Sequence, residues 1–271
     1  MDRALAFDTL GIDALFSSGG CCSGDREAGA AEGGLRNEPV APVARFTRVV
    51  SWFGSRDADF VRRLGALVPG AIVAPSVQAG RLVWQHLVLT AGAALDDADR
   101  WREPVAVPAP LVAAGRRALG SAGWDGESQL VVVHPGAGGL AKRWPASGFA
   151  AVLDRLAWRE GVTLAVHQGP ADAAAVAALT AQWPGRRLRL TEPPLTSLAG
   201  VLRCATAYLG NDSGISQLAA ALGVPSVVLL TAGNLDWRPW ARHVEPLVVA
   251  TSALDAADVE RVAEATAGAL G

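Results

Sequence analysis

A short turn, Asn211 to Gly214, carries residue types suited to binding phosphate. An apolar stretch, Ala207–Leu209, precedes the turn, and a run with the composition of a buried helix follows it. A helix N-terminus presents unpaired N–H groups and a partial positive charge, and Gly214 would let the backbone approach a ligand. The turn therefore predicts a phosphate cradle. The alternative is that Asp212 and Ser213 only cap a buried helix.

A second loop, His134 to Gly139, likewise lies between an apolar stretch and a predicted helix. A buried apolar stretch, Leu130–Val133, leads into it, and two cations, Lys142 and Arg143, follow with Trp144-Pro145. A glycine-rich loop between a strand and a helix, with a cation in reach, suits an anion. The spacing is neither that of a Walker A motif nor G-x-G-x-x-G. The alternative for Lys142 is a solvated surface lysine.

The elements that must position these two loops alternate between strand and helix through the second half of the chain. We predict strands at Leu130–Val133, Thr163–His167, Leu188–Leu190, Ala207–Leu209, Ser226–Leu230 and Leu247–Val249. Helices are predicted at Ser147–Trp158, Ala171–Gln182, Ser197–Cys204, Gly214–Leu222 and Ala256–Leu270. Such alternation predicts a parallel sheet covered by helices on both faces, with both loops at the carboxyl ends of the strands.

The first half is less regular. We expect helices at Arg3–Phe16, Asp57–Leu67, Arg81–Ala94 and Leu111–Leu119, a loop over Ser17–Pro42, a buried strand within Arg45–Gly54 and a strand at Ala71–Ala74. The polar, glycine-rich stretch Gly120–Ser128 is typical of a linker. We therefore predict two domains, residues 1–122 and residues 123–271.

Composition excludes several classes of protein. The 271 residues are 51% hydrophobic and 18% charged, with a formal net charge of −2. That balance predicts a folded core and argues against a binder of nucleic acid. No apolar run is long enough to span a membrane and no secretory signal is apparent, so a cytoplasmic protein with at most peripheral membrane contact is expected. The three cysteines, Cys21, Cys22 and Cys204, do not predict a disulfide framework.

Together the two loops resemble glycosyltransferase family 9, the ADP-heptose:lipopolysaccharide heptosyltransferase family. Its members carry HPG, a small-residue loop and K-x-W-P, and about seventy residues later D-[ST]-G-x-x-H leading into A-A-x-G-x-P. Here these motifs stand as HPGAGGLAKRWP and NDSGISQLAAALGVP. The resemblance covers about Gln129 to Gly271 well and the first half loosely.

The resemblance implies a GT-B-like α/β fold of two Rossmann-like domains, the N-terminal one shortened. The C-terminal domain would bind a nucleotide-diphosphate sugar, ADP-heptose being the first expectation, and the N-terminal domain a glycan or lipid-linked acceptor. Neither a metal nor another cofactor is implied. The donor-binding residues carried over are Gly138 and Gly139 beside the phosphate, Lys142 neutralising it, and Asp212, Ser213 and Gly214 in the cradle.

Other positions are carried over with alternatives. Asp172 falls where the family often has a Glu that holds the ribose, and an exposed Asp at a helix start is the alternative. Pro193 to Leu195 would lie beside the base. Trp237 and Trp240 would either close over the donor or pack in the interior, and packing is favoured. His134 is expected to be structural.

The chain departs from the family pattern at two places. Gln217 replaces the motif histidine, and an amide can donate to phosphate but carries no charge. Members also begin with a strand and a Gly-Asp turn whose Asp is taken to activate the acceptor. No such turn opens this chain, and Asp13 is not assigned the role, so the catalytic base is unassigned.

The expected function is therefore metal-independent transfer of a sugar, with heptose among the candidates, from a nucleotide-diphosphate donor to a glycan or lipopolysaccharide-type acceptor. The main alternative is a catalytically inactive protein of the same fold that binds a nucleotide sugar or a partner. An unrelated nucleotide-binding α/β protein would require both motifs to be coincidental.

Overall fold

The computed structural model describes residues 42–96 and 98–271, in two compact units that divide after Leu95. The helix expected at Arg3–Phe16, most of the loop expected over Ser17–Pro42, and Asp13 lie outside the described residues.

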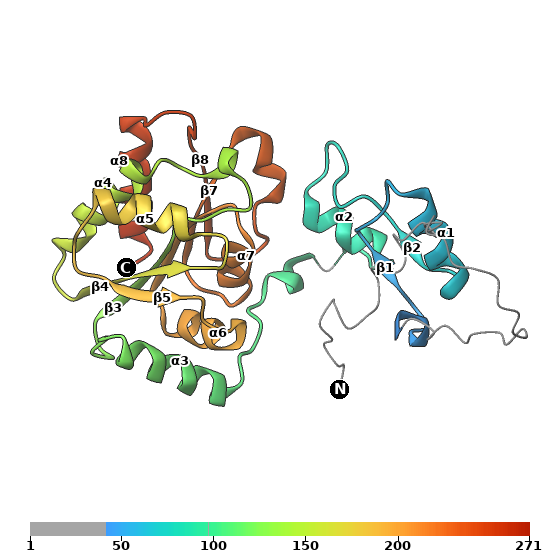
Figure 1. Ribbon diagram of the computed structural model, residues 1–271, viewed down its shortest axis with the longest axis horizontal. Coiled ribbons are helices and arrows are strands. Elements are labelled where there is room, and N and C mark those ends of the chain that lie inside the picture. Colours follow the sequence, from blue (N-terminus) through green and yellow to red (C-terminus); the bar gives the residue numbers. More distant parts are fainter. Residues whose placement is uncertain (1–41, 97) are drawn as a thin grey trace, which may run out of the picture. The chain divides into compact units, whose positions relative to one another are not determined.

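The described part of the first unit, residues 42–95, holds two short parallel strands, two α-helices and one 3-10 helix (Figure 1). Its elements are η3 (Pro42–Arg45), β1 (Val50–Ser51), α1 (Ala58–Leu67), β2 (Ile72–Val73) and α2 (Val83–Thr90). Asp57 caps α1 by accepting from the backbone N–H groups of Asp59 and Phe60. We expected a buried strand within Arg45–Gly54. A strand, β1, does lie in this range, but the predicted burial is wrong, because β1 is only half-buried. Its sole described strand partner is β2, so within residues 42–96 no wider sheet encloses it.

The second unit contains a six-stranded parallel sheet in the order β5-β4-β3-β6-β7-β8. The strands are β3 (Gln129–His134), β4 (Val162–Gln168), β5 (Leu188–Thr191), β6 (Ala207–Asn211), β7 (Ser226–Leu230) and β8 (Val244–Val248). The helices are η4 (Ala98–Arg102), α3 (Ala109–Ser121), η5 (Leu140–Lys142), α4 (Ala146–Ala157), α5 (Ala173–Gln182), α6 (Leu195–Cys204), α7 (Gly214–Ala221), η6 (Ala232–Trp237) and α8 (Ala256–Gly268). The predicted parallel sheet is confirmed.

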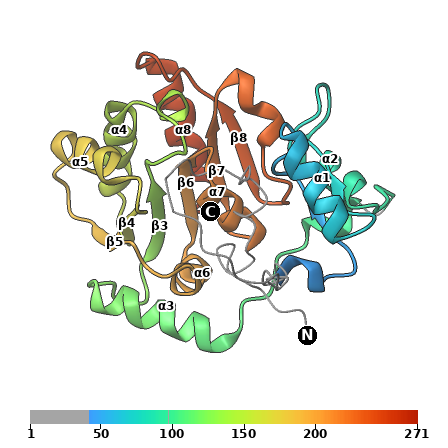
Figure 2. The ribbon, with the colours of Figure 1, turned by 45° about the vertical axis from the view of Figure 1, so that its right-hand side comes forward.

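Helices cover both faces of this sheet. Alternate side chains of β3 point to opposite faces, and both sets are buried. Val131 and Val133 join the core beneath α4, α5 and α8, whereas Leu130 and Val132 join the core beneath α3, α6 and α7. Figures 1 and 2 show α4, α5 and α8 gathered on one side of the sheet and α3 and α6 on the other. A strand buried on both faces explains the unbroken apolar run that predicted β3.

The boundary between the units differs from the predicted one. We expected the break at residues 122 and 123, but α3 belongs to the second unit because it packs closely on α6. A Cβ atom on Gly115 would lie 2.1 Å from the backbone of Gly200, and one on Gly200 would lie 2.0 Å from the Leu111 carbonyl oxygen. The two helices can approach this closely only because both positions are glycine.

Candidate donor-binding site

The two loops singled out by their sequences meet at the carboxyl edge of the sheet. β3 ends at His134 and β6 ends at Asn211, and the two loops follow directly. β3 and β6 are paired neighbours, with His134 opposite Gly210. In open parallel sheets ligands bind at this edge, particularly where the strand order reverses, and β3 and β6 flank that reversal here.

Asn211 ties the two loops together. Its side chain is fully buried; Oδ1 accepts from the backbone N–H of Trp144 at 3.0 Å, and Nδ2 donates to the Pro135 carbonyl at 2.8 Å. One amide thus fixes the segment that carries Lys142 relative to the start of the loop after β3. Sequence reasoning missed this residue, although a buried amide with both ends engaged strongly constrains its neighbours.

Lys142 and Asp212 form an ion pair at the mouth of the site. The Lys142 Nζ lies 2.8 Å from Asp212 Oδ2, which also accepts from Asn234 Nδ2 at 3.3 Å. The ammonium group lies 5.9 Å from the centre of the Trp237 ring. Lysine has three donors, so an ammonium held by one carboxylate oxygen retains donors for a ligand. The Lys142 side chain is 36% exposed, but its ammonium group is paired with the buried Asp212 rather than solvated alone.

The N-terminus of α7 has the geometry of an anion cradle. Ser213 is the N-cap and accepts from the Ser216 backbone N–H at 3.2 Å. Gly214 opens the helix, and a Cβ atom built on it would meet no heavy atom within 4 Å. The space at the Cβ position of Gly214 is therefore open. Gly138 and Gly139, in the other loop, likewise have nothing within 4 Å of a built Cβ.

Gln217 lies one turn further along α7. Its Nε2 donates to the Trp237 carbonyl oxygen at 2.8 Å, so the amide is engaged with η6. This contact links the helix of the cradle to the segment that also approaches Lys142. A role of Gln217 in contacting phosphate stays a prediction.

Asp172 is buried, which rules out the exposed-helix-start alternative. It occupies the N-cap position of α5 without making a side-chain capping bond there; its Oδ2 accepts from the Gly169 N–H at 3.0 Å instead. His134 Nε2 lies 3.8 Å from the same oxygen. The carboxylate therefore lies at the carboxyl end of β4, beside the loop after β3, and its role in holding a ribose stays a prediction.

Two buried histidines lie behind Asp172. The Nδ1 atoms of His134 and His167 are 3.0 Å apart. Burial lowers the pKa of His134, against opposing effects of Asp172 and the His167 backbone, and Arg143 lowers it further. Burial, reinforced by His134, lowers the pKa of His167 from 6.5 to about 4. Both rings are therefore neutral at pH 7.

The loop after β5 completes this edge of the sheet. Leu195 begins α6 with 64% of its surface exposed, an unusual position for a large apolar side chain. Glu192, just after β5, has a φ of 47°, in the left-handed region that non-glycine residues rarely adopt. Sequence reasoning missed Glu192, because nothing in the residue type signals that conformation.

The two tryptophans differ in their surroundings. Trp240 Nε1 donates to the Ala98 carbonyl oxygen at 3.0 Å, and the Arg102 guanidinium lies 4.6 Å from its ring centre, which supports the packing role. Trp237 remains 36% exposed beside Lys142. Only Trp237 therefore borders the candidate site.

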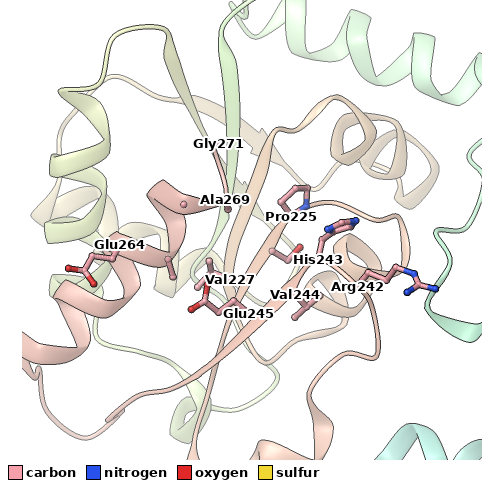
Figure 3. Close-up of a pocket in the computed structure, with 12 residues that line it drawn as sticks. Pro225, Val227, Arg242, His243, Val244, Glu245, Glu264, Ala269 and Gly271 are labelled. Atoms are coloured by element: carbon pink, nitrogen blue, oxygen red, sulfur yellow. The ribbon is translucent and has the colours of Figure 1, made fainter. Parts of the chain in front are cut away.

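A cavity of about 760 Å³ lies elsewhere, at the amino ends of β7 and β8 (Figure 3). Pro225, His243 and Glu264 line it, and none belongs to the loops above. A smaller cavity of about 310 Å³ adjoins the loop after β3 and is lined by Pro135, Arg143 and Trp144 among others. Within residues 42–96 and 98–271, no group of three or more His, Cys, Asp or Glu side chains could hold a metal ion.

Comparison with known proteins gives a consistent result. The profile of glycosyltransferase family 9 (heptosyltransferase) matches residues 81–265, more than half of the chain. No curated protein sequence matches the chain. A solved structure of a family 9 glycosyltransferase from Veillonella parvula is similar with a TM-score of 0.65 at 18% identity, covering 78% of this chain and 71% of that one.

Two structures from E. coli are also similar. ADP-heptose LPS heptosyltransferase II gives a TM-score of 0.60 at 19% identity, covering 84% of this chain and 78% of that one. Heptosyltransferase WaaC with ADP gives 0.53 at 15% identity, covering 81% and 72%. Identities this low show a shared fold, which is the GT-B-like fold that the two loops predicted.

Proposed function

The chain belongs to glycosyltransferase family 9, the heptosyltransferase family, and on that premise we propose that it transfers a sugar from a nucleotide-diphosphate donor to an acceptor hydroxyl. The observation that carries the proposal is the pairing of Lys142 with Asp212 directly beside the open N-terminus of α7. We propose ADP-heptose as the first donor to test. A glycan or lipopolysaccharide-type acceptor and a cytoplasmic location are proposed with it. Among the described residues no helix is long and apolar enough to cross a membrane.

The donor side of this chemistry follows from the arrangement of charges. When the bond from the sugar to the diphosphate breaks, negative charge grows on the leaving oxygen. The Lys142 ammonium and the first-turn N–H groups of α7 would oppose that charge. Because Asn211 and Asp212 hold the loop and the lysine in place beforehand, little reorganisation would be required during the reaction.

The acceptor side requires a base that removes a proton from the attacking hydroxyl. No base for this step is assigned among the described residues, so we keep a second candidate function. In that alternative the protein binds a nucleotide sugar and catalyses no transfer. The donor site described above would be the same in both cases.

Calorimetric titration with ADP, GDP, UDP and their sugars, followed by hydrolysis and transfer assays, tests the proposal. Binding of one nucleotide sugar with turnover supports a transferase and identifies its nucleotide. Binding without turnover, with or without candidate acceptors, favours the inactive binder. If the folded protein binds none of them, the proposed donor site is wrong.

A further inference from the structure

The buried Asp172 carboxylate is used in an unusual way for its position. An aspartate at an N-cap ordinarily accepts from backbone N–H groups of the helix it opens. Asp172 makes no such bond to α5, and its side chain is only 11% exposed. The carboxylate is turned backward, toward Gly169 and His134. Its placement therefore serves something other than capping.

Two glycines make room for this carboxylate. A Cβ atom on Gly136 would lie 2.0 Å from Asp172 Oδ1, and one on Gly169 would lie 2.7 Å from Oδ2. Gly136 belongs to the loop after β3 and Gly169 to the loop after β4, so the carboxylate is wedged between the backbones of two loops. Any side chain at Gly136 would displace it.

The two histidines form a chain that ends on the carboxylate. One proton is shared between the facing Nδ1 atoms, 3.0 Å apart, so one ring donates and the other accepts. If His134 donated, its bare Nε2 would face the buried carboxylate, 3.8 Å away, and the two lone pairs would repel. If His167 donates, His134 carries its proton on Nε2 and directs an N–H toward Asp172. The second arrangement is favoured because the site is buried and its polar groups need partners.

We infer that His134 and His167 are positioning residues for the donor site: their ordered N–H groups hold the Asp172 carboxylate in place between the loops after β3 and β4, where it would meet the donor's ribose. The inference rests on the proposed function, because the ribose is part of the proposed donor. The inference gives His134, the histidine of the HPG motif, a role, whereas the proposed phosphate site at α7 does not involve this residue.

The first arm of the test needs no ligand. In the full-length protein at pH 7.5, ¹⁵N NMR of the histidine rings should show His134 with its proton on Nε2 and His167 with its proton on Nδ1. The variant His243→Gln, which removes an exposed histidine at the amino end of β8, identifies the His243 signals by their loss and should leave both tautomers unchanged. His86→Gln and His134→Phe identify the signals of His86 and His134 in the same way, which leaves those of His167. A His134 proton on Nδ1, or a positively charged His134, would overturn the inference.

The second arm measures binding of ADP, GDP or UDP, whichever binds the unmodified protein. His134→Phe and Asp172→Asn should each raise Kd about tenfold or more. The Kd of the double variant should not exceed that of the single variant that binds more weakly. The same nucleotide lacking both ribose hydroxyls should bind the unmodified protein and all three variants equally. Additive losses, or losses that persist without the hydroxyls, would overturn the inference.

His134→Gln keeps the test decisive if His134→Phe fails to fold. Its amide keeps an N–H donor near the position of Nε2. It should bind within about threefold of the unmodified protein. A tenfold loss in His134→Gln with an unchanged circular dichroism spectrum would count against positioning by the N–H group. Failure of the unmodified protein to bind any nucleotide would overturn the proposed function instead, and the tautomers would still decide how the cluster is ordered.

Discussion

The Lys142 ammonium lies 2.8 Å from the Asp212 carboxylate, although 70 residues separate them in the chain. The aspartate side chain is 7% exposed and the lysine side chain 36%. The buried carboxylate therefore holds the ammonium group in place, while part of the lysine side chain faces solvent. The lysine of one motif is thus oriented by the aspartate of the other. The ion pair therefore brings the two motifs together at one place.

Replacing Lys142 with alanine should weaken donor binding. The loss should be about 1.5–3 kcal/mol, the range for a hydrogen bond to a charged group, or roughly a 10- to 100-fold rise in Kd by calorimetry. The matched control is Arg155→Ala, which breaks an exposed ion pair with Glu260 at the far end of α4. That variant should bind normally, because exposed pairs contribute little and this one is remote. An unchanged Kd in Lys142→Ala would remove the lysine from the site.

Gly214→Ala separates stability from binding. The added Cβ meets no protein atom, and alanine favours helix, so the free energy of unfolding should stay the same or rise by up to about 1 kcal/mol. Donor binding should weaken about tenfold, and further in Gly214→Val, because the side chain would occupy the space proposed for the diphosphate. Gly120→Ala, at an equally open glycine in α3, should change stability alone. Normal binding by Gly214→Val would contradict the cradle.

Asn211→Leu should destabilise the protein. It removes a fully buried amide and leaves the Trp144 N–H and the Pro135 carbonyl without that partner. We expect the free energy of unfolding in urea to fall by about 2–4 kcal/mol. Ser226→Ala removes a single buried hydrogen bond at the opposite edge of the sheet and should lower it by about 1 kcal/mol. Equal losses in the two variants would show that Asn211 does not clamp the loops.

Stability should decline as the pH falls from about 6.5 toward 4. Burial, followed by the effect of His134, lowers the folded-state pKa of His167 to about 4 from its ordinary 6.5, so in this window the unfolded chain binds a proton that the native state does not. The His134 pKa is lowered as well. The loss attributable to His167 should reach on the order of 3 kcal/mol at most. Urea unfolding at several pH values measures it, and His167→Gln should flatten the slope. An equally steep decline in that variant would assign the effect to other groups.

The central strands of the second half were predictable because β3, β6 and β7 are buried on both faces. Such strands read as unbroken apolar runs, and the position of β7 and the start of β6 agree with the expectation. The start of β5 agrees as well, although β5 alternates buried and exposed residues. The first half was harder. The helix expected at Arg81–Ala94 is only Val83–Thr90, and the expected linker at Gly120–Ser128 follows a helix that packs on α6. The glycines that allow this packing read in the sequence as ordinary helix-weakening residues.

The sequence alone determined the class of this protein, because local signals carry it: apolar runs, glycine turns and two short motifs in the right order. Only the tertiary structure decided which residues meet. Lys142 faces Asp212, Asn211 clamps both loops, and Asp172 is buried beside His134 rather than exposed at a helix start. These contacts join residues far apart in the chain, and they follow from the pairing of β3 with β6 and β4. No local pattern specifies that pairing, because it depends on how the whole sheet buries its apolar faces.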